Sequence, residues 1–264
     1  MLIRLLFLAA FCFAPAAIAD AQTRRRAVPP ARYMSPPASI AVLSRAQFES
    51  GLMRSQGAPV FVAIRRNFPA ESRVLFDNLY SAYIGTVRAS PADRARASAG
   101  VQHDFYRSLV PYLRLAPEAD LLRAMQARLA VFEMLQQTNV SMCARISHGS
   151  EGVSVSAAFT QLNGRALTAL IDAAGAGRRT PVAPRAPYTA EDRRLTSETF
   201  ARVDPTGDLL PLAMSEGEVN VEPDRQCRYV IALMRLALAL PTETGVKMEI
   251  LMLERSVVGR DAGL

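Results

Sequence analysis

Residues 138–149, with the sequence TNVSMCARISHG, bring several chemically active residue types into one short stretch. Cys143 and His148 are the types found as a thiol nucleophile and its general base. Asn139 begins an Asn-Val-Ser triplet, which has the form of an N-glycosylation acceptor. The stretch is therefore a candidate catalytic site, a candidate modification site or one half of a disulfide.

The catalytic interpretation requires the His148 imidazole to lie within hydrogen-bond reach of the Cys143 sulfur. Five residues along an α-helix turn the chain by about 500°, so the two side chains would diverge by about 140°. Only a turn at 147–149 would bring the ring back. Helical geometry therefore disfavours this pair, which remains the alternative to a structural role for Cys143.

Other catalytic or metal-binding patterns are weak. His103 and His148, taken with the cysteines, lack the paired close spacings of zinc sites. His103 precedes Asp104, but neighbours on a helix point about 100° apart, so we interpret His103 as a structural or exposed histidine with acid–base work as the alternative. The chain has no GxSxG, HExxH, SxxK, P-loop or complete GxGxxG motif. We predict no metal and no cofactor.

Carboxylates and tyrosines supply two further candidate groups. Glu118, Glu133 and Asp172 could contribute to a glycosidase pair, but sequence spacing does not give the distance between carboxyl groups that such chemistry requires. Their ordinary role is surface solubility. Three tyrosines near arginines, which could line a groove for an envelope polymer or simply pack in amphipathic helices, are Tyr106, Tyr112 and Tyr229.

The amino terminus has the layout of a secretory signal peptide. Arg4 precedes an uncharged run over 5–19, which ends in the small residues that a signal peptidase requires. We expect cleavage after Ala19, with Ala21 as the alternative. We therefore assign 1–19 to the signal peptide and 20–39, rich in Ala, Arg and Pro, to a disordered leader.

Two alternatives to cleavage are less consistent with the residues. A retained membrane helix needs about 20 predominantly apolar residues, and this run is shorter and contains Pro15. Lipidation at Cys12 would require a small residue before it, where the chain has Phe11. We therefore expect a periplasmic or secreted protein.

Export makes a disulfide the default state of the remaining cysteines. Removal of the signal peptide removes Cys12 and leaves Cys143 and Cys227. Both lie on apolar stripes of predicted helices, so both thiols should point into a core. A bridge closing about 85 residues stabilises by about 4.5 kcal/mol on the chain-entropy argument. We predict a Cys143–Cys227 disulfide.

Charge and composition indicate a bacterial envelope protein. The formal net charge is +7 and Lys247 is the only lysine, a bias towards arginine that, with abundant alanine, is typical of GC-rich genomes. In such a chain we expect the triplet at Asn139 to be accidental. The charge suits an anionic partner, but export argues against nucleic acid. Apart from the run at Arg24, Arg25 and Arg26, the arginines are dispersed, as on solvated helix faces.

Helix signals recur along the chain. A proline in the first turn, followed by acidic residues, favours a helix start because that turn's N–H groups have no intrahelical partner. The clearest helix runs from Pro117 towards Ile146, with a possible break near Asn139, and a second covers 224 to about 240. Prolines precede amphipathic patterns at five positions: Pro69, Pro91, Pro117, Pro223 and Pro241.

Two departures from helix are expected. Prolines three residues apart favour an extended connector at 175–190. This connector contains Gly175 and Gly177, which form only a fragment of a GxGxxG motif. Short β-branched runs at 60–64 and 153–155 are candidate strands. The fold class is therefore mostly α, a helical bundle-like domain over 40–264 with, at most, a minor short β element.

These observations favour binding or scaffolding in the bacterial envelope over catalysis. The expected partner is an envelope protein or polymer, or an anionic membrane surface, and not nucleic acid. The alternative function is a peptidoglycan-active envelope hydrolase that uses carboxylates from different helices.

Overall fold

The computed structural model describes residues 42–147, 156–209 and 221–258, which form helices and contain no strand. The mostly α fold class is confirmed for these ranges. The helices in chain order are α2 (Arg45–Leu52), α3 (Ala58–Asn67), α4 (Pro69–Thr86), α5 (Pro91–Leu113), α6 (Glu118–Thr138), α7 (Val140–Ser147), α8 (Ala157–Arg179), α9 (Ala190–Val203), α11 (Pro223–Ala239) and α12 (Thr242–Val258).

All five proline signals mark helix starts. Pro69, Pro91 and Pro223 stand in the first turns of α4, α5 and α11. Pro117 is the N-cap of α6, and Pro241 directly precedes α12. Local chemistry therefore sets these boundaries.

The helix predicted from Pro117 towards Ile146 is broken at Asn139. This residue has φ −161° and ψ 80°, and its backbone N–H bonds Leu135 as the C-cap of α6. Its side-chain Oδ1 accepts a hydrogen bond from the Met142 N–H at 2.9 Å, which satisfies a free donor of α7. Asn139 thus ends one helix and begins the next.

The strand predicted at 60–64 is wrong, because these residues belong to α3. Val60, Phe61 and Ile64 are buried together with Ala63 and Asn67. Their spacing of three and four residues is the period of a helix with one face in the core, and Pro59 stands in its first turn. The β-branched residues therefore follow tertiary burial and not strand propensity.

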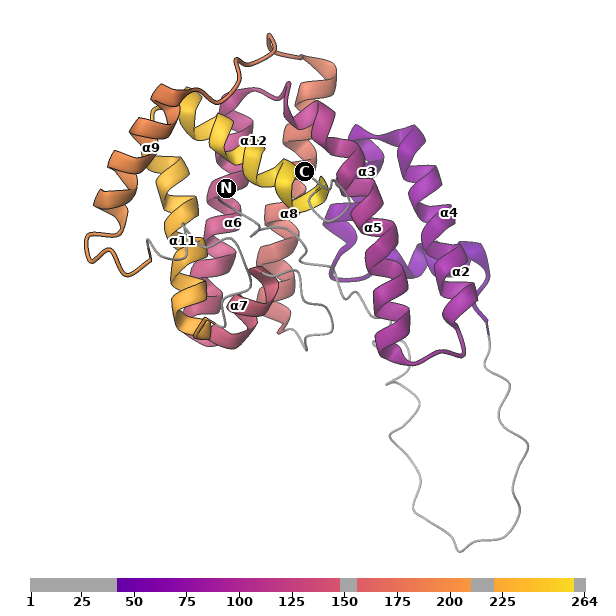
Figure 1. Ribbon diagram of the computed structural model, residues 1–264. Helices are drawn as coiled ribbons and strands as arrows, with labels where there is room; N and C mark the ends of the chain where they lie inside the picture. The colour runs from indigo at the N-terminus through magenta and orange to yellow at the C-terminus, as the bar shows by residue number, and fades with distance from the viewer. Residues whose placement is uncertain (1–41, 148–155, 210–220, 259–264) are drawn as a thin grey trace, which may run out of the picture.

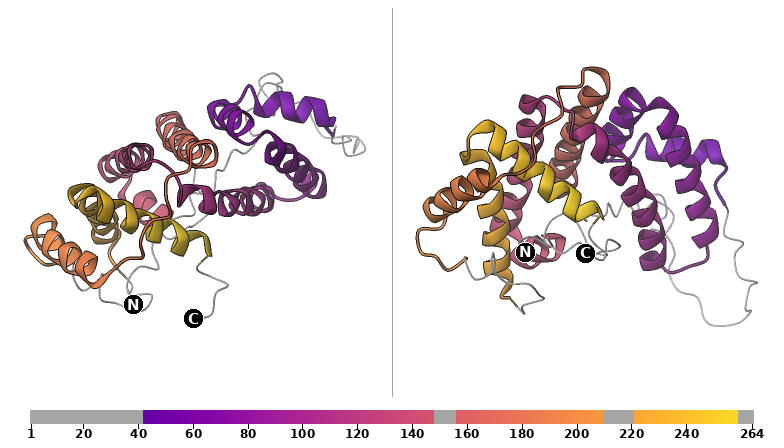
Figure 2. Two further views of the ribbon diagram at one scale, coloured as in Figure 1. Left: turned by 90° about the horizontal axis from the view of Figure 1, so that it is seen from above. Right: turned by 45° about the horizontal axis from the view of Figure 1, so that its top comes forward.

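The two ends of the molecule are joined by three helices, α6, α8 and α12. α2 to α5 lie at one end, α9 and α11 at the other, and α6 and α8 lie between them, with α7 near their lower ends (Figure 1; Figure 2). α12 crosses the others and contacts α5, α6 and α11. Two apolar clusters form the core, and α6, α8 and α12 contribute residues to both.

The predicted connector at 175–190 begins later than expected. Residues 175–179 are the last turns of α8, because Gly175 and Gly177 allow close packing that a larger residue would prevent. A Cβ on Gly177 would overlap the Tyr112 carbonyl oxygen and lie 2.8 Å from the Ala116 nitrogen. The extended part starts at Thr180 and crosses the turn between α5 and α6, where the Val182 N–H bonds the Leu115 oxygen at 2.9 Å.

Some of the predicted features lie outside the described residues. They are the signal peptide at 1–19, the leader at 20–39 with Arg24 to Arg26, and the candidate strand at 153–155. Within the described ranges, every helix is too short or too polar to cross a membrane.

Candidate functional site

Cys143 of α7 and Cys227 of α11 are paired in a disulfide, with their Cα atoms 5.4 Å apart. Both side chains are fully buried in the core cluster that contains α11. The bridge joins segments separated by 84 positions, on either side of the connector that follows α8. Because Cys143 is bonded to Cys227, it has no free thiol that could act as a nucleophile. His148, its candidate general base, lies outside the described residues.

None of the three carboxylates predicted as hydrolase candidates lines the pocket described below. Asp172 accepts hydrogen bonds from Arg66 and Asn67, and Glu133 pairs with Arg235 at 2.8 Å. Glu118 lies in the first turn of α6, where its negative charge interacts favourably with the helix dipole. These groups therefore have structural partners.

The three tyrosines do not form one groove. Tyr229 is 1 % exposed, and burial raises its pKa to about 12. Tyr112 packs against Phe68 and the Arg178 guanidinium. Tyr106 alone lines a pocket.

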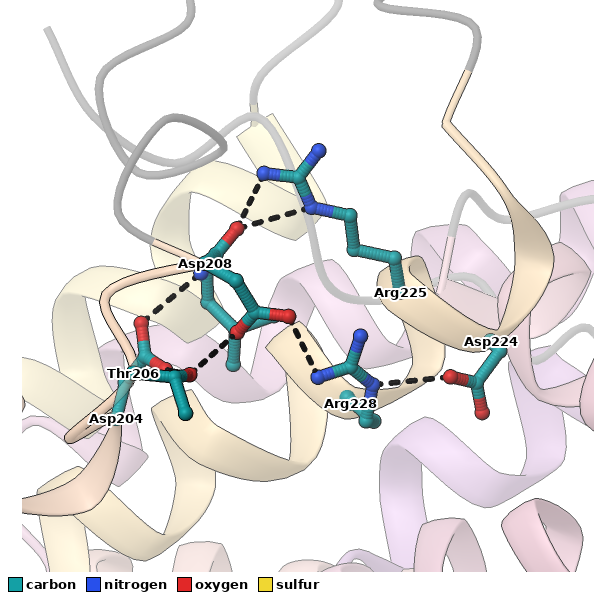
Figure 3. Close-up of polar contacts among 7 residues, drawn as sticks. Asp204, Thr206, Asp208, Asp224, Arg225 and Arg228 are labelled. Carbon is teal, nitrogen blue, oxygen red and sulfur yellow. Dashed lines mark hydrogen bonds and ion pairs between the residues drawn. The ribbon is translucent and has the colours of Figure 1, made fainter.

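A polar cluster attaches the chain after α9 to the start of α11 (Figure 3). Arg228 pairs with the Asp208 carboxylate at 2.8 Å and lowers the pKa of that group. Arg225 donates to the Asp208 carbonyl at 2.9 Å, and the Thr206 hydroxyl contacts both Asp204 and Asp208. The carboxylates already have partners, and no metal-ligand cluster of His, Cys, Asp and Glu occurs in the described ranges. We assign this cluster a structural role.

A second buried polar group joins α9 to α12. Asp192 is 5 % exposed and contacts the Lys247 ammonium at 3.3 Å. Burial disfavours its ionised form, but hydrogen bonds from Thr244, Thr189 and Lys247 outweigh this and hold the pKa of Asp192 well below its ordinary value. Lys247 also pairs with Glu243 at 2.8 Å. Because all partners are supplied by the protein, this network is structural.

A pocket lies among α5, α6, α7, α8 and α12, where the two core clusters meet. Its volume is about 90 Å³, smaller than the roughly 150 Å³ of an engineered apolar cavity that binds benzene. Most of its surface is aliphatic or aromatic. The lining residues are Ala99, Gln102, His103, Tyr106, Val110, Leu113, Ala124, Arg128, Val131, Phe132, Ile146, Asn163, Ala166, Leu167, Leu170, Glu249 and Leu253.

Glu249 is the unusual member of this lining. It is 5 % exposed and lies on the buried stripe of α12 with Val246 and Leu253. Its Oε2 atom is buried and has no hydrogen-bond partner in the structure. Burial raises the pKa of Glu249 to about 8, although the charges of Arg128 and Arg185 oppose the shift. At neutral pH this carboxyl is therefore mostly protonated.

Arg128 supplies positive charge to the same pocket. It comes from α6 and stacks over the Phe132 ring at 5.7 Å. Burial lowers the pKa of Arg128 to about 9, and the Glu249 carboxylate opposes this effect. The guanidinium therefore keeps its charge at neutral pH.

Neutral polar groups complete the site. Gln102 and Asn163 are both buried, and their side chains line the pocket from α5 and α8. Burial also raises the pKa of Tyr106, which keeps its phenol protonated as a possible donor. His103 lines the pocket, and its Nδ1 atom lies 3.8 Å from Oδ1 of Asp104. A mostly apolar cavity with a few converging polar groups is the common form of a small-molecule site.

Sequence reasoning had singled out His103 and Tyr106 but had missed Glu249, Arg128 and the pocket. One signal was present, since Glu249 is the single acidic residue within the otherwise apolar run 248–253. A charged residue on the apolar stripe of a helix is a candidate for a buried, functional group. The partners on α5, α6 and α8 come from distant parts of the chain.

The chain matches no family model, no curated protein and no solved structure.

Proposed function

We propose that this protein is a binding module of the bacterial envelope, exported and stapled by the Cys143–Cys227 disulfide, and that it binds a small, mostly apolar ligand in the pocket beneath α12. The observation that carries this proposal is the buried Glu249 carboxyl in the lining of a mostly apolar pocket, where its Oε2 atom has no hydrogen-bond partner. A buried polar group without a partner costs about 1–3 kcal/mol, and an apolar residue at this position would avoid that cost. Such groups are found where a ligand supplies the missing partner.

The pocket favours binding over the peptidoglycan hydrolase that is the alternative. Most glycoside hydrolases use two carboxyl groups about 5 to 9.5 Å apart. Glu249 is the single carboxylate of the residues that line this pocket, and the described Glu118, Glu133 and Asp172 are not among them. The raised pKa of Glu249 would suit a general acid, but a general acid alone does not complete this chemistry.

The export part of the proposal is supported by the amino-terminal sequence and by the cysteine pair. Mass spectrometry of the protein produced in a Gram-negative host tests it. The proposal predicts a chain that begins after Ala19 or Ala21 and is recovered from the periplasmic fraction. A full-length chain recovered from the cytoplasm contradicts export.

Binding can be tested by NMR titration of the ¹⁵N-labelled protein with 1-hexanol. The expected result is saturable shifts of backbone amides that surround the pocket, particularly on α8 and α12. Shifts confined to other surfaces, or none up to the solubility limit of the alcohol, contradict the proposal.

Pocket-filling variants provide the control. Ala166→Leu adds volume at a buried lining residue, and Leu167→Phe does so at a partly buried one. Both should reduce hexanol binding by about tenfold or more, at a stability cost of about 1–3 kcal/mol for the overpacked site. Ala70→Leu makes the same change on the exposed face of α4 and should leave binding unchanged.

A further inference from the structure

The polar groups of the pocket indicate the chemistry of the ligand's head, an inference that rests on the binding function proposed above. The buried Oε2 atom of Glu249 has no hydrogen-bond partner in the structure. Burial raises the pKa of this carboxyl, and its protonated form donates one hydrogen bond. A ligand that takes this hydrogen bond must place an acceptor beside Glu249.

The positive charges near Glu249 favour an acceptor that carries a negative charge. Arg128 lines the pocket, and Arg185 is also close enough to influence Glu249 electrostatically. Bringing a ligand ammonium beside these guanidinium groups would add like-charge repulsion in a site of low dielectric, whereas an anion would be attracted.

Arg128 is the better candidate for the direct contact. Arg185 donates hydrogen bonds to the carbonyls of Arg114 and Ala116, at 2.6 and 2.5 Å, and is influenced by Glu118 and Glu243 as well as by Glu249. These two bonds hold the connector on the turn between α5 and α6, while the buried Nε atom of Arg185 has no hydrogen-bond partner. Arg128 is itself part of the pocket wall.

The remaining lining residues indicate the polarity and size of the rest of the ligand. Leu113, Val131, Leu170 and Leu253 are aliphatic and come from four different helices. The pocket is partly open, and its enclosed volume of about 90 Å³ is smaller than the roughly 150 Å³ of an engineered cavity that binds benzene. It can therefore enclose only part of a six-carbon chain, and it is too small for a polycyclic ring system.

We infer that the pocket binds a short-chain amphipathic carboxylate, whose alkyl body fills the apolar cavity and whose carboxylate accepts hydrogen bonds from Glu249 and Arg128. The protonated acid and the guanidinium together form a donor pair for one carboxylate. Gln102 and Asn163 contribute neutral polar groups to the same wall.

Three ligands with the same alkyl chain test this inference: hexanoate, 1-hexanol and hexylammonium. Calorimetric titration of the full mature chain at neutral pH should give hexanoate the highest affinity, about tenfold above hexanol, since charge-assisted hydrogen bonds are the stronger ones. Hexylammonium should bind at least about tenfold more weakly than hexanoate because of the neighbouring arginine charge.

Two variants locate the head group. Arg128→Met should lower hexanoate affinity about tenfold more than it lowers hexanol affinity, and an unchanged circular dichroism spectrum checks that the variant is folded. Arg123→Met, on the exposed side of α6 where Arg123 pairs with Asp120, is the matched control and should behave as the unaltered protein. Glu249→Gln retains an N–H donor and should retain hexanoate binding, whereas Glu249→Met removes the donor and should lower it.

The outcomes separate this inference from the proposed function. Equal affinity for hexanoate and hexanol would overturn the carboxylate assignment while leaving the binding function intact. Tightest binding of hexylammonium would show that Glu249 acts as an ionised partner and would overturn it too. If none of the three ligands binds, both the inference and the proposed binding function fail.

Discussion

The buried Glu249 carboxyl predicts a distinctive dependence of stability on pH. Its pKa is about 8 in the folded protein, against 4.5 for the exposed side chain. Between these values the folded state holds a proton that the unfolded state releases. The free energy of unfolding must therefore fall as pH rises, by about 1.4 kcal/mol for each pH unit.

The stabilising contribution is fully present below about pH 4.5 and is lost as pH rises through about pH 8. The total comes to about 5 kcal/mol, an upper figure because local opening and water entry reduce the effect of burial. Even half of this would be a large part of the stability of an ordinary domain.

Urea unfolding of the unaltered protein and of Glu249→Gln, between about pH 5 and pH 8, measures this contribution. Glutamine keeps the size of the side chain but cannot ionise, so the difference in unfolding free energy between the two proteins should change by several kcal/mol over the range. Glu133→Gln, which removes a partly exposed partner of Arg235, is the control and should give a nearly constant difference. If the Glu249→Gln profile runs parallel to that of the unaltered protein, the buried, protonated state of Glu249 is refuted.

Three further changes test the frame that holds the pocket. The mature protein should release no thiol to Ellman's reagent under denaturing, non-reducing conditions, and replacing Cys143 and Cys227 by serine should cost about 4.5 kcal/mol by the chain-entropy argument; two free thiols would disprove the disulfide. Gly177→Ala should destabilise by about 1–3 kcal/mol in urea unfolding because its Cβ would overlap the backbone between α5 and α6, whereas Gly100→Ala, with open space around it, should be neutral or stabilising. Asp192→Asn should cost about 3 kcal/mol because it removes the buried carboxylate beside Lys247 and leaves that lysine paired only with the exposed Glu243, and thermal unfolding that matches the unaltered protein would count against the network between α9 and α12.

Much of the helical frame could be predicted from local patterns. Proline positions, acidic first turns and apolar periodicity act within a few residues, so they identified the starts of five helices and the break at Asn139. The two cysteines outside the predicted signal peptide also indicated their own pairing. The candidate site was less accessible, because His103 and Tyr106 were noted individually without the residues that make them part of a pocket.

The wrong predictions have physical reasons. A short β-branched run such as 60–64 fits a strand or a buried helix equally well in sequence, and only the packing of α3 against α4 and α8 decides between them. The glycines at 175 and 177 suggested a loop, but in α8 they permit close contact with Asn67 and with the end of α5.

The sequence by itself determined where five of the helices begin, that the chain is mostly α and that Cys143 and Cys227 are the cysteines outside the predicted signal peptide. These properties depend on neighbouring residues and on residue counts. Only the tertiary structure decided that the Oε2 atom of Glu249 is buried without a hydrogen-bond partner, that Arg128 lines the same pocket and that most of this pocket is apolar. Burial and charge are properties of surroundings, and α5, α6, α8 and α12 create those surroundings only when they pack together.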